Sequence, residues 1–166
     1  MTNLKENEFN DIIGDILINN KFNSLDNEVH HGITRYGHSL RVARMTYRLM
    51  KMFKMKNYKE ATRAALLHDF YCNTDMGEFN RKETLHQHPQ MAFQNATQFY
   101  ELSPIGENII KSHMFPLKGE LPKYKESWVV SGADKAVASY ELYRFKFSMV
   151  ISIWLLFLFN IITMQK

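Results

Sequence analysis

The sequence predicts an all-α helical bundle, and three observations lead to this prediction. Apolar residues recur at spacings near 3.6 along most of the chain, whereas the period-two alternation of strands is hard to find. Proline and asparagine turn signals divide the chain into segments of helical length. The 166 residues, 45% hydrophobic and 23% charged, suit one globular domain and argue against a disordered, collagen-like or disulfide-based chain.

Two helices are expected in the first third of the chain. The first covers residues 10–18 and ends at the turn signal Asn19-Asn20. The second covers residues 36–55, where apolar positions recur with helical spacing. Five apolar residues share one face of this second helix: Val42, Met45, Leu49, Met52 and Phe53.

Four further helices follow, and turn or capping signals mark their ends. An Ala-rich helix covers residues 58–70 and ends at the polar turn 72–75. The next begins at His88-Pro89 and runs to Tyr100, because proline suits the first position of a helix. Ser103-Pro104 repeats this start signal for a helix to residue 113, and a sixth helix covers residues 127–145.

The C-terminal segment 147–165 is uncharged and forms a separate hydrophobic helix after a domain that covers residues 1–146. As a helix it is about 28 Å long, near the hydrocarbon thickness of a bilayer. Two interpretations stay open. The segment is a membrane anchor, which its apolar residues on all sides favour, or it closes the bundle or forms the subunit interface of a homodimer.

Charge and cysteine content bear on location and partners. Residues 35–59 contain eight Lys or Arg and no acid, and four of these form a helical stripe at positions 41, 44, 48 and 51. No aromatic residue or nucleic-acid motif accompanies the stripe, so we interpret it as a solvated face and expect no nucleic-acid partner. A lone Cys72 and a polar N-terminus predict a cytoplasmic protein, attached to the membrane if the C-terminal helix is an anchor.

Seven histidines against one cysteine favour nitrogen ligands, and the positions of five residues or pairs point to one site. His38 lies on the apolar face of its helix, and His68-Asp69 closes the Ala-rich helix. His88 lies at a helix start and His113 at a helix end. Asp134 lies in a stretch of small apolar residues, where a carboxylate is costly unless it is paired or binds a metal.

These residues stand in three segments whose order resembles the HD-domain metal-dependent phosphohydrolase superfamily. The segments are YGHSLRVA at 36–43, ALLHD at 65–69 and GADK at 132–135. The resemblance covers residues 31–140 and implies an HD-domain helical bundle. The layout is most similar to the bacterial HD-type hydrolases that split diadenosine tetraphosphate symmetrically, although the hydrophobic tail and the segment 114–117 depart from that branch.

The resemblance also implies one or two divalent metal ions and their ligands. The first ion is bound by His38, His68, Asp69 and Asp134. A second is bound by His88 and His113, with Asp69 as a bridge, although His86 lies close enough to His88 that either can face the site. Nitrogen and oxygen ligands do not choose among Mn²⁺, Fe²⁺, Mg²⁺, Co²⁺ and Zn²⁺.

The expected chemistry is hydrolysis of a small phosphorylated substrate, a nucleotide in particular, by metal-activated water. Catalysis is assigned to Asp69, His68 and Lys135. Positive side chains hold the phosphate, and the candidates are Arg35, Arg41 and Lys111. Two alternatives stay open, since the ligand set does not separate them. They are a catalytically silent metal- and nucleotide-binding signalling module and a di-iron oxygenase on the same scaffold.

Overall fold

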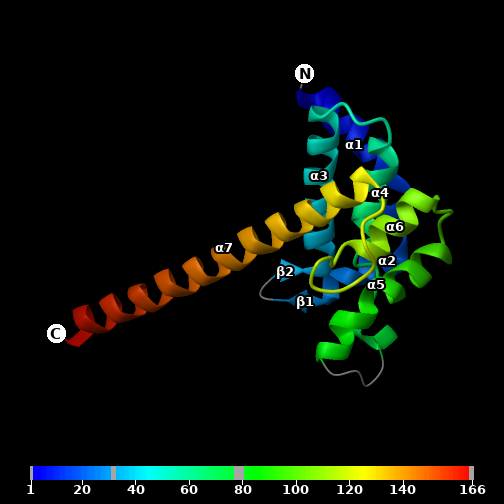
Figure 1. The fold of residues 1–166 in the computed structure, drawn as a ribbon. Helices are drawn as coiled ribbons and strands as arrows, with labels where there is room; N and C mark the ends of the chain where they lie inside the picture. Colours follow the sequence, from blue (N-terminus) through cyan, green and yellow to red (C-terminus); the bar gives the residue numbers. More distant parts are fainter. Residues whose placement is uncertain (1, 31–32, 77–80, 165–166) are drawn as a thin grey trace.

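A computed structural model shows a helical bundle from which one long helix projects (Figure 1). It describes the backbone of residues 2–30, 33–76 and 81–164. The helices are α1 (Thr2–Leu17), α2 (Asn20–Asn23), α3 (Arg35–Met52), α4 (Tyr58–Leu67), α5 (Arg81–Thr97), α6 (Pro104–Ser112) and α7 (Lys125–Met164), with short 3₁₀ turns η1 (Ser24–Asn27) and η2 (Asn73–Met76). Strands β1 (Val29–His30) and β2 (Ile33–Thr34) pair antiparallel before α3. The prediction of an all-α bundle is confirmed.

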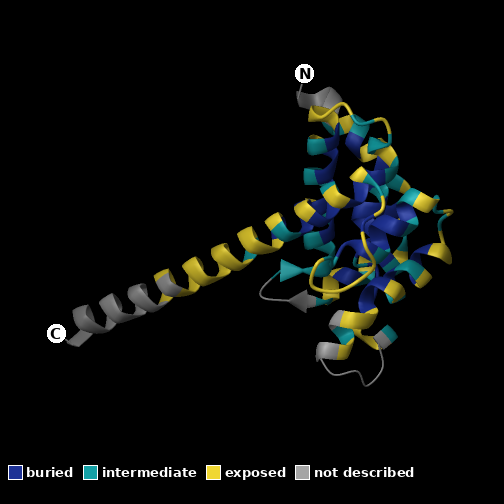
Figure 2. Cartoon of the chain, viewed as in Figure 1, coloured by how far each residue is buried: buried dark blue, intermediate teal, exposed yellow. Residues whose placement is uncertain are grey.

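Helix α4 forms the centre of the bundle. It packs against α3 and α6, and also against α1, α5 and α7. Its residues Ala61, Ala64 and Ala65 are at most 1% exposed, because small side chains let several helices approach one axis closely. The buried residues in Figure 2 therefore gather around α4, and its C-terminal end lies inside the protein.

Local capping signals set where α3 and α6 begin. The Thr34 hydroxyl accepts a hydrogen bond from the Gly37 amide at 3.1 Å, and the Ser103 hydroxyl accepts one from the Ile105 amide at 3.1 Å. Pro104 occupies the first turn of α6, as the sequence predicts. These caps place His38 one turn into α3 and His113 just after α6.

Several predicted helix boundaries are wrong. Helix α1 begins at Thr2, eight residues before the predicted start at residue 10. Helix α5 begins at Arg81, so that Pro89 lies inside it and not at its start. Pro89 is buried, and burial of this part of α5 outweighs the lost backbone hydrogen bond. Helix α3 ends at Met52, where Lys54 adopts a left-handed conformation with φ of 52°.

The predicted apolar face of α3 is correct at its centre and wrong at its end. Val42 is fully buried, and Met45 and Leu49 pack against the core. Met52 and Phe53, by contrast, are 64% and 62% exposed. The helix stops at these residues, and the end of its apolar stripe is left facing solvent.

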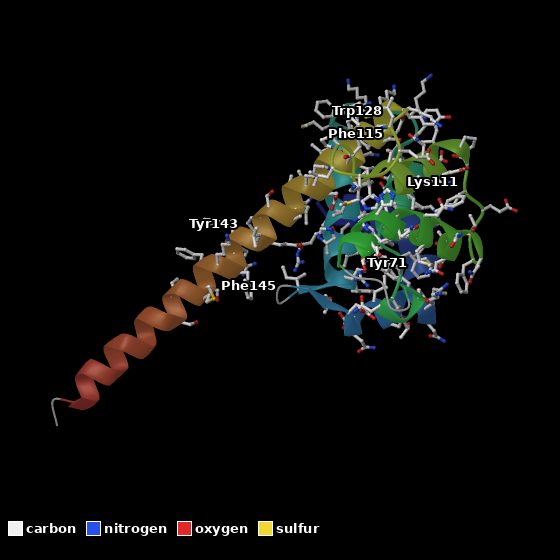
Figure 3. The ribbon with its side chains drawn as sticks, turned by 60° about the horizontal axis from the view of Figure 1, so that its bottom comes forward. Tyr71, Lys111, Phe115, Trp128, Tyr143 and Phe145 are labelled. Atoms are coloured by element: carbon white, nitrogen blue, oxygen red, sulfur yellow. The ribbon has the colours of Figure 1, made fainter. Side chains whose placement is uncertain are left out.

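The predicted sixth helix and the predicted C-terminal helix are one continuous helix, α7. Its second half leaves the body, and Figure 3 shows Tyr143 and Phe145 on this projecting part. Residues 147–149 and 151–152 are exposed, so this portion does not close the bundle. The side chains at 150 and 153–165, which make up most of the predicted anchor, lie outside the described residues. Within the described portion of the chain, no helix combines the length and apolar character needed to cross a membrane.

Three of the four residues in the basic stripe of α3 (Arg41, Arg48 and Lys51) are exposed, and two of the four pair with acids of α1. Arg44 donates to Glu6, and Lys51 donates to Glu8 at 3.0 Å. Glu6 and Glu8 therefore offset part of the positive charge of the stripe.

Candidate metal centre

Five helices bring all six predicted ligands to one place. His38 comes from α3, His88 from α5 and Asp134 from α7, while His68 and His113 occupy the C-terminal caps of α4 and α6. Asp69 follows His68 directly. Two helix C-termini, with their partial negative charge, thus meet at the cluster, which favours a cation there.

Three of the imidazoles are oriented by the backbone of their own helices. Nδ1 of His68 lies 2.8 Å from the Ala65 carbonyl oxygen, and Nδ1 of His113 lies 2.7 Å from that of Ile110. Nδ1 of His88 lies 3.1 Å from the Thr84 carbonyl oxygen. Because a carbonyl only accepts, each Nδ1 carries the proton, and each Nε2 presents a lone pair to the cluster.

The first group of ligand atoms surrounds Asp134. Its Oδ1 lies 3.0 Å from Nε2 of His38 and 3.6 Å from Nε2 of His68. These three residues offer ligand atoms that lie within 4.8 Å of one another, the spacing that one metal ion requires. The group contains three of the four residues predicted to bind the first ion, and the fourth is Asp69.

The second group surrounds one oxygen of Asp69. Its Oδ1 lies 3.5 Å from Nε2 of His88 and 3.6 Å from Nε2 of His113, whereas its Oδ2 lies 3.7 Å from Nε2 of His68. One carboxylate therefore faces both groups, which is the arrangement expected of a bridging ligand. His86 is exposed and His88 is buried, so His88 is the histidine that faces the site.

Two observations show that these residues fit a metal ion. Nε2 of His68 and Oδ1 of Asp69 are buried without a hydrogen-bond partner. Nε2 of His88 and Nε2 of His113 lie only 3.0 Å apart, although both present lone pairs. A cation bound between these atoms would give the buried polar atoms a partner and remove the repulsion between the lone pairs. The nitrogen and oxygen donors suit a divalent transition metal.

Burial and neighbouring charges act on the cluster in opposite directions. Burial lowers the pKa of His113 to about 3, which keeps this imidazole neutral and able to bind a metal. Burial also lowers the pKa of His38, but hydrogen bonds to Asp134 and Glu141 outweigh it and raise that pKa to about 10. Burial raises the pKa of Asp134, yet the hydrogen bond from His38 and the nearby His68 imidazole hold it below its usual range.

A cavity of about 430 Å³ opens onto the cluster. His38, Asp69, His88 and Asp134 line it, so the proposed ligands are accessible to a molecule in the cavity. Five apolar side chains form another part of its wall: Ile33, Met114, Leu117, Ala138 and Leu142. Its size and mixed lining are typical of a small-molecule site.

Two of the predicted basic residues line this cavity. Nη1 of Arg35 donates to the Tyr71 carbonyl oxygen at 2.7 Å, and its guanidinium lies 3.9 Å from the centre of the Tyr71 ring. Nζ of Lys135 donates to the carbonyl oxygen of His113 and to the hydroxyl of Ser131, each at 2.8 Å. Lys135 thus satisfies a free carbonyl at the end of α6.

The other two basic residues do not line this cavity. Arg41 donates to Glu141 at 2.8 Å and is not among the residues that line the cavity. Lys111 donates to Glu107 at 2.7 Å and lies over the Phe93 ring, also outside the cavity lining. Each side chain is thus engaged by an acid, and the partner of Arg41, Glu141, itself lines the cavity.

Sequence reasoning missed two residues of the site. Glu141 accepts a hydrogen bond from Nδ1 of His38 at 2.8 Å, and the Tyr71 ring lies against that of His88. The spacing offered a signal for Glu141, which follows Asp134 by two helical turns and so shares its face of α7. Tyr71 follows Asp69 by two residues and carries no comparable pattern.

Comparison with protein families supports the resemblance drawn from the motifs. The HD domain model matches residues 35–139, which is more than half of the chain and includes all six proposed ligands. No curated protein and no solved structure matches the chain. The match to the family, together with the helical fold and the His and Asp cluster, shows that the chain belongs to the HD domain family.

Proposed function

We propose that the protein is a metal-dependent phosphohydrolase that cleaves a phosphate ester or anhydride of a nucleotide or another small phosphorylated molecule. The observation that carries this proposal is the Asp69 carboxylate, whose two oxygens face two separate histidine groups beside the cavity. Divalent metal ions at such a centre lower the pKa of water and offset the negative charge of a phosphoryl group.

The chain's own residues have separate roles in this reaction. Asp69 and His68 hold the centre between the two groups, and Lys135 fixes the end of α6 that carries His113. Arg35 lies at the cavity wall, where its guanidinium also contacts Asn73 and Glu28, and the N–H groups that these contacts leave available bind phosphate oxygens. The oxygen of water bonds to phosphorus, the bond from phosphorus to the leaving group breaks, and the leaving group takes up a proton.

The cavity supports a substrate with a polar and an apolar end. The phosphate lies toward the ligands and Arg35, and a nucleobase lies against Ile33, Met114 and Leu142. A nucleotide has both parts. The resemblance to hydrolases of diadenosine tetraphosphate makes this dinucleotide a required member of the substrate panel, beside mononucleotides and simple phosphate esters.

The test is metal analysis of anaerobically purified full-length protein, followed by phosphate release from this panel. Asp69→Asn should lose bound metal and turnover together, because it removes the charge that both groups share. Asp26→Asn is the matched control, since Asp26 is an exposed carboxylate outside the cluster. If Asp69→Asn keeps full metal content and turnover, the assignment is wrong.

The same experiment separates the two alternatives. Metal binding with nucleotide affinity but no phosphate release, over the full panel, supports a silent binding module. Oxygen consumption that depends on bound iron supports a di-iron oxygenase. Either outcome overturns the hydrolase proposal while leaving the metal centre in place.

A further inference from the structure

Glu141 lies beyond the residues that match the HD domain, which end at residue 139. It belongs to α7, where the helix begins to leave the body, and its side chain is only 12% exposed. Both of its carboxylate oxygens are engaged. Oε2 accepts from Nδ1 of His38, and Oε1 accepts from Nη1 of Arg41, each at 2.8 Å.

His38 differs from the other three imidazoles in how it is held. His68, His88 and His113 each direct Nδ1 to a carbonyl oxygen of their own chain segment, three or four residues earlier. Nδ1 of His38 is directed instead to a side chain on another helix. Its orientation therefore depends on the packing of α7 against α3 and on one carboxylate.

The two nitrogens of His38 meet two carboxylates of the same helix. Nε2 lies 3.0 Å from Asp134 and Nδ1 lies 2.8 Å from Glu141. These acids are two helical turns apart, and both face α3. The imidazole is thus held at both ring nitrogens: Glu141 contacts Nδ1 and sets the ring plane, and Nε2 is directed at Asp134 in the cluster.

We propose that Glu141 is a positioning residue of the metal centre, acting through His38, and that Arg41 holds Glu141 in place. The inference rests on the proposed function, because it requires that the cluster binds metal. A carboxylate on the outer nitrogen of a metal-binding imidazole fixes the tautomer and makes the inner nitrogen a better ligand. Arg41 thus acts on the centre indirectly, through Glu141.

The test measures Mn²⁺ binding to the full chain by calorimetry and by electron paramagnetic resonance, without any substrate. Glu141→Ala removes the charge and the hydrogen bond, and Glu141→Gln removes the charge alone. We expect about 10- to 100-fold weaker binding at the His38 site for Ala and a smaller loss for Gln. Binding at the His88 and His113 site should stay unchanged, so the spectrum should shift from coupled to isolated Mn²⁺.

Glu126→Gln is the matched control, because Glu126 is a buried carboxylate of the same helix that bonds to Asn57, away from the cluster. Arg41→Gln provides a second variant, which leaves Glu141 present but unsupported and should weaken the same site by a smaller factor. Melting of the metal-free variants monitors the fold. A positioning role leaves the metal-free melting temperature near that of the wild type.

The outcomes are distinguishable. If the wild type binds no Mn²⁺ at all, the metal centre fails, and the inference fails with it. If the wild type binds and the Glu141 variants bind equally well, the inference alone is overturned. Equal weakening at both sites, in step with a lower metal-free melting temperature, shows a structural role for Glu141 and also overturns it.

Discussion

Replacement of Glu8 by Gln should destabilise the protein, although Glu8 lies far from the metal centre. Glu8 belongs to α1, which is outside the residues that match the HD domain. Its carboxylate accepts hydrogen bonds from the Tyr47 hydroxyl at 2.6 Å, the Tyr58 hydroxyl at 2.7 Å and Lys51 at 3.0 Å. One side chain thus attaches α1 to α3 and α4, the helices that carry His38 and His68.

The expected loss follows from these bonds. A hydrogen bond to a charged acceptor contributes about 1.5–3 kcal/mol to stability. The Glu8 side chain is 32% exposed, so solvent weakens its ion pair with Lys51, and Gln keeps one acceptor oxygen. The two tyrosine bonds therefore dominate, and we expect a net loss of about 2 kcal/mol. For a chain of this length, that lowers the melting temperature by roughly 4–8 °C.

The contribution of Glu8 to stability should also depend on pH. Hydrogen bonds from Tyr47, Tyr58 and Lys51 lower the pKa of Glu8 from 4.5 to about 2. A lowered pKa in the folded state contributes stability that is fully present above pH 4.5 and is lost as the pH falls toward 2. The difference between wild type and Glu8→Gln should thus be full at pH 7 and less than half as large at pH 3.

Thermal unfolding followed by circular dichroism in metal-free buffer at pH 7 and pH 3 measures both effects. Glu6→Gln is the matched control on the same helix, because Glu6 makes a single exposed ion pair with Arg44 and should contribute at most about 1 kcal/mol. Equal melting of Glu8→Gln and wild type at pH 7 refutes the reasoning. So does a difference that persists unchanged at pH 3.

Three further predictions concern the cavity, the tail and the metal. Arg35→Gln should raise KM for a phosphorylated substrate about tenfold with unchanged metal content. Lys111→Gln should leave KM unchanged in the same steady-state assay, because Arg35 lines the cavity and Lys111 does not. A chain ending at residue 146 should keep the melting temperature and metal content of the full chain, because the described side chains at 147–149 are exposed. A lower melting temperature or a lower metal content would show that the removed segment contributes to the fold. The protein with metal at a hundred times Kd should melt roughly 5–11 °C higher than the protein treated with a chelator. Calorimetric scans measure both melting temperatures, and equal values contradict a bound ion.

Local signals in the sequence predicted part of the fold well. Ser103 and Pro104 mark the start of α6 in both sequence and structure, because capping involves only neighbouring residues. The same rule failed at Pro89, where burial of α5 decides the outcome. The single helix α7 was also missed, since the sequence was divided at the loss of charge after Lys146 and charge alone does not end a helix.

In the candidate site, too, local features were predicted from the sequence and long-range contacts were not. The motifs correctly predicted that all six ligands meet, because their positions at helix ends and on an apolar face are local properties of the sequence. Side-chain partners are not local. Arg41 pairs with Glu141, a hundred residues later, and no spacing on α3 could reveal this. The ion pair of Lys111 could have been predicted, since Glu107 lies one helical turn before it.

The orientation of the histidines has a consequence for how the protein can change by mutation. The groups that hold His68, His88 and His113 are backbone carbonyls, which every residue type supplies. Substitution at Ala65, Thr84 or Ile110 therefore leaves the acceptor in place. The partner of His38 is a side chain that one nucleotide change can remove. The hydrogen bonds that orient three of these imidazoles therefore survive substitution of the partner residue. The bond that orients His38 does not, so mutation at Glu141 can weaken or abolish metal binding.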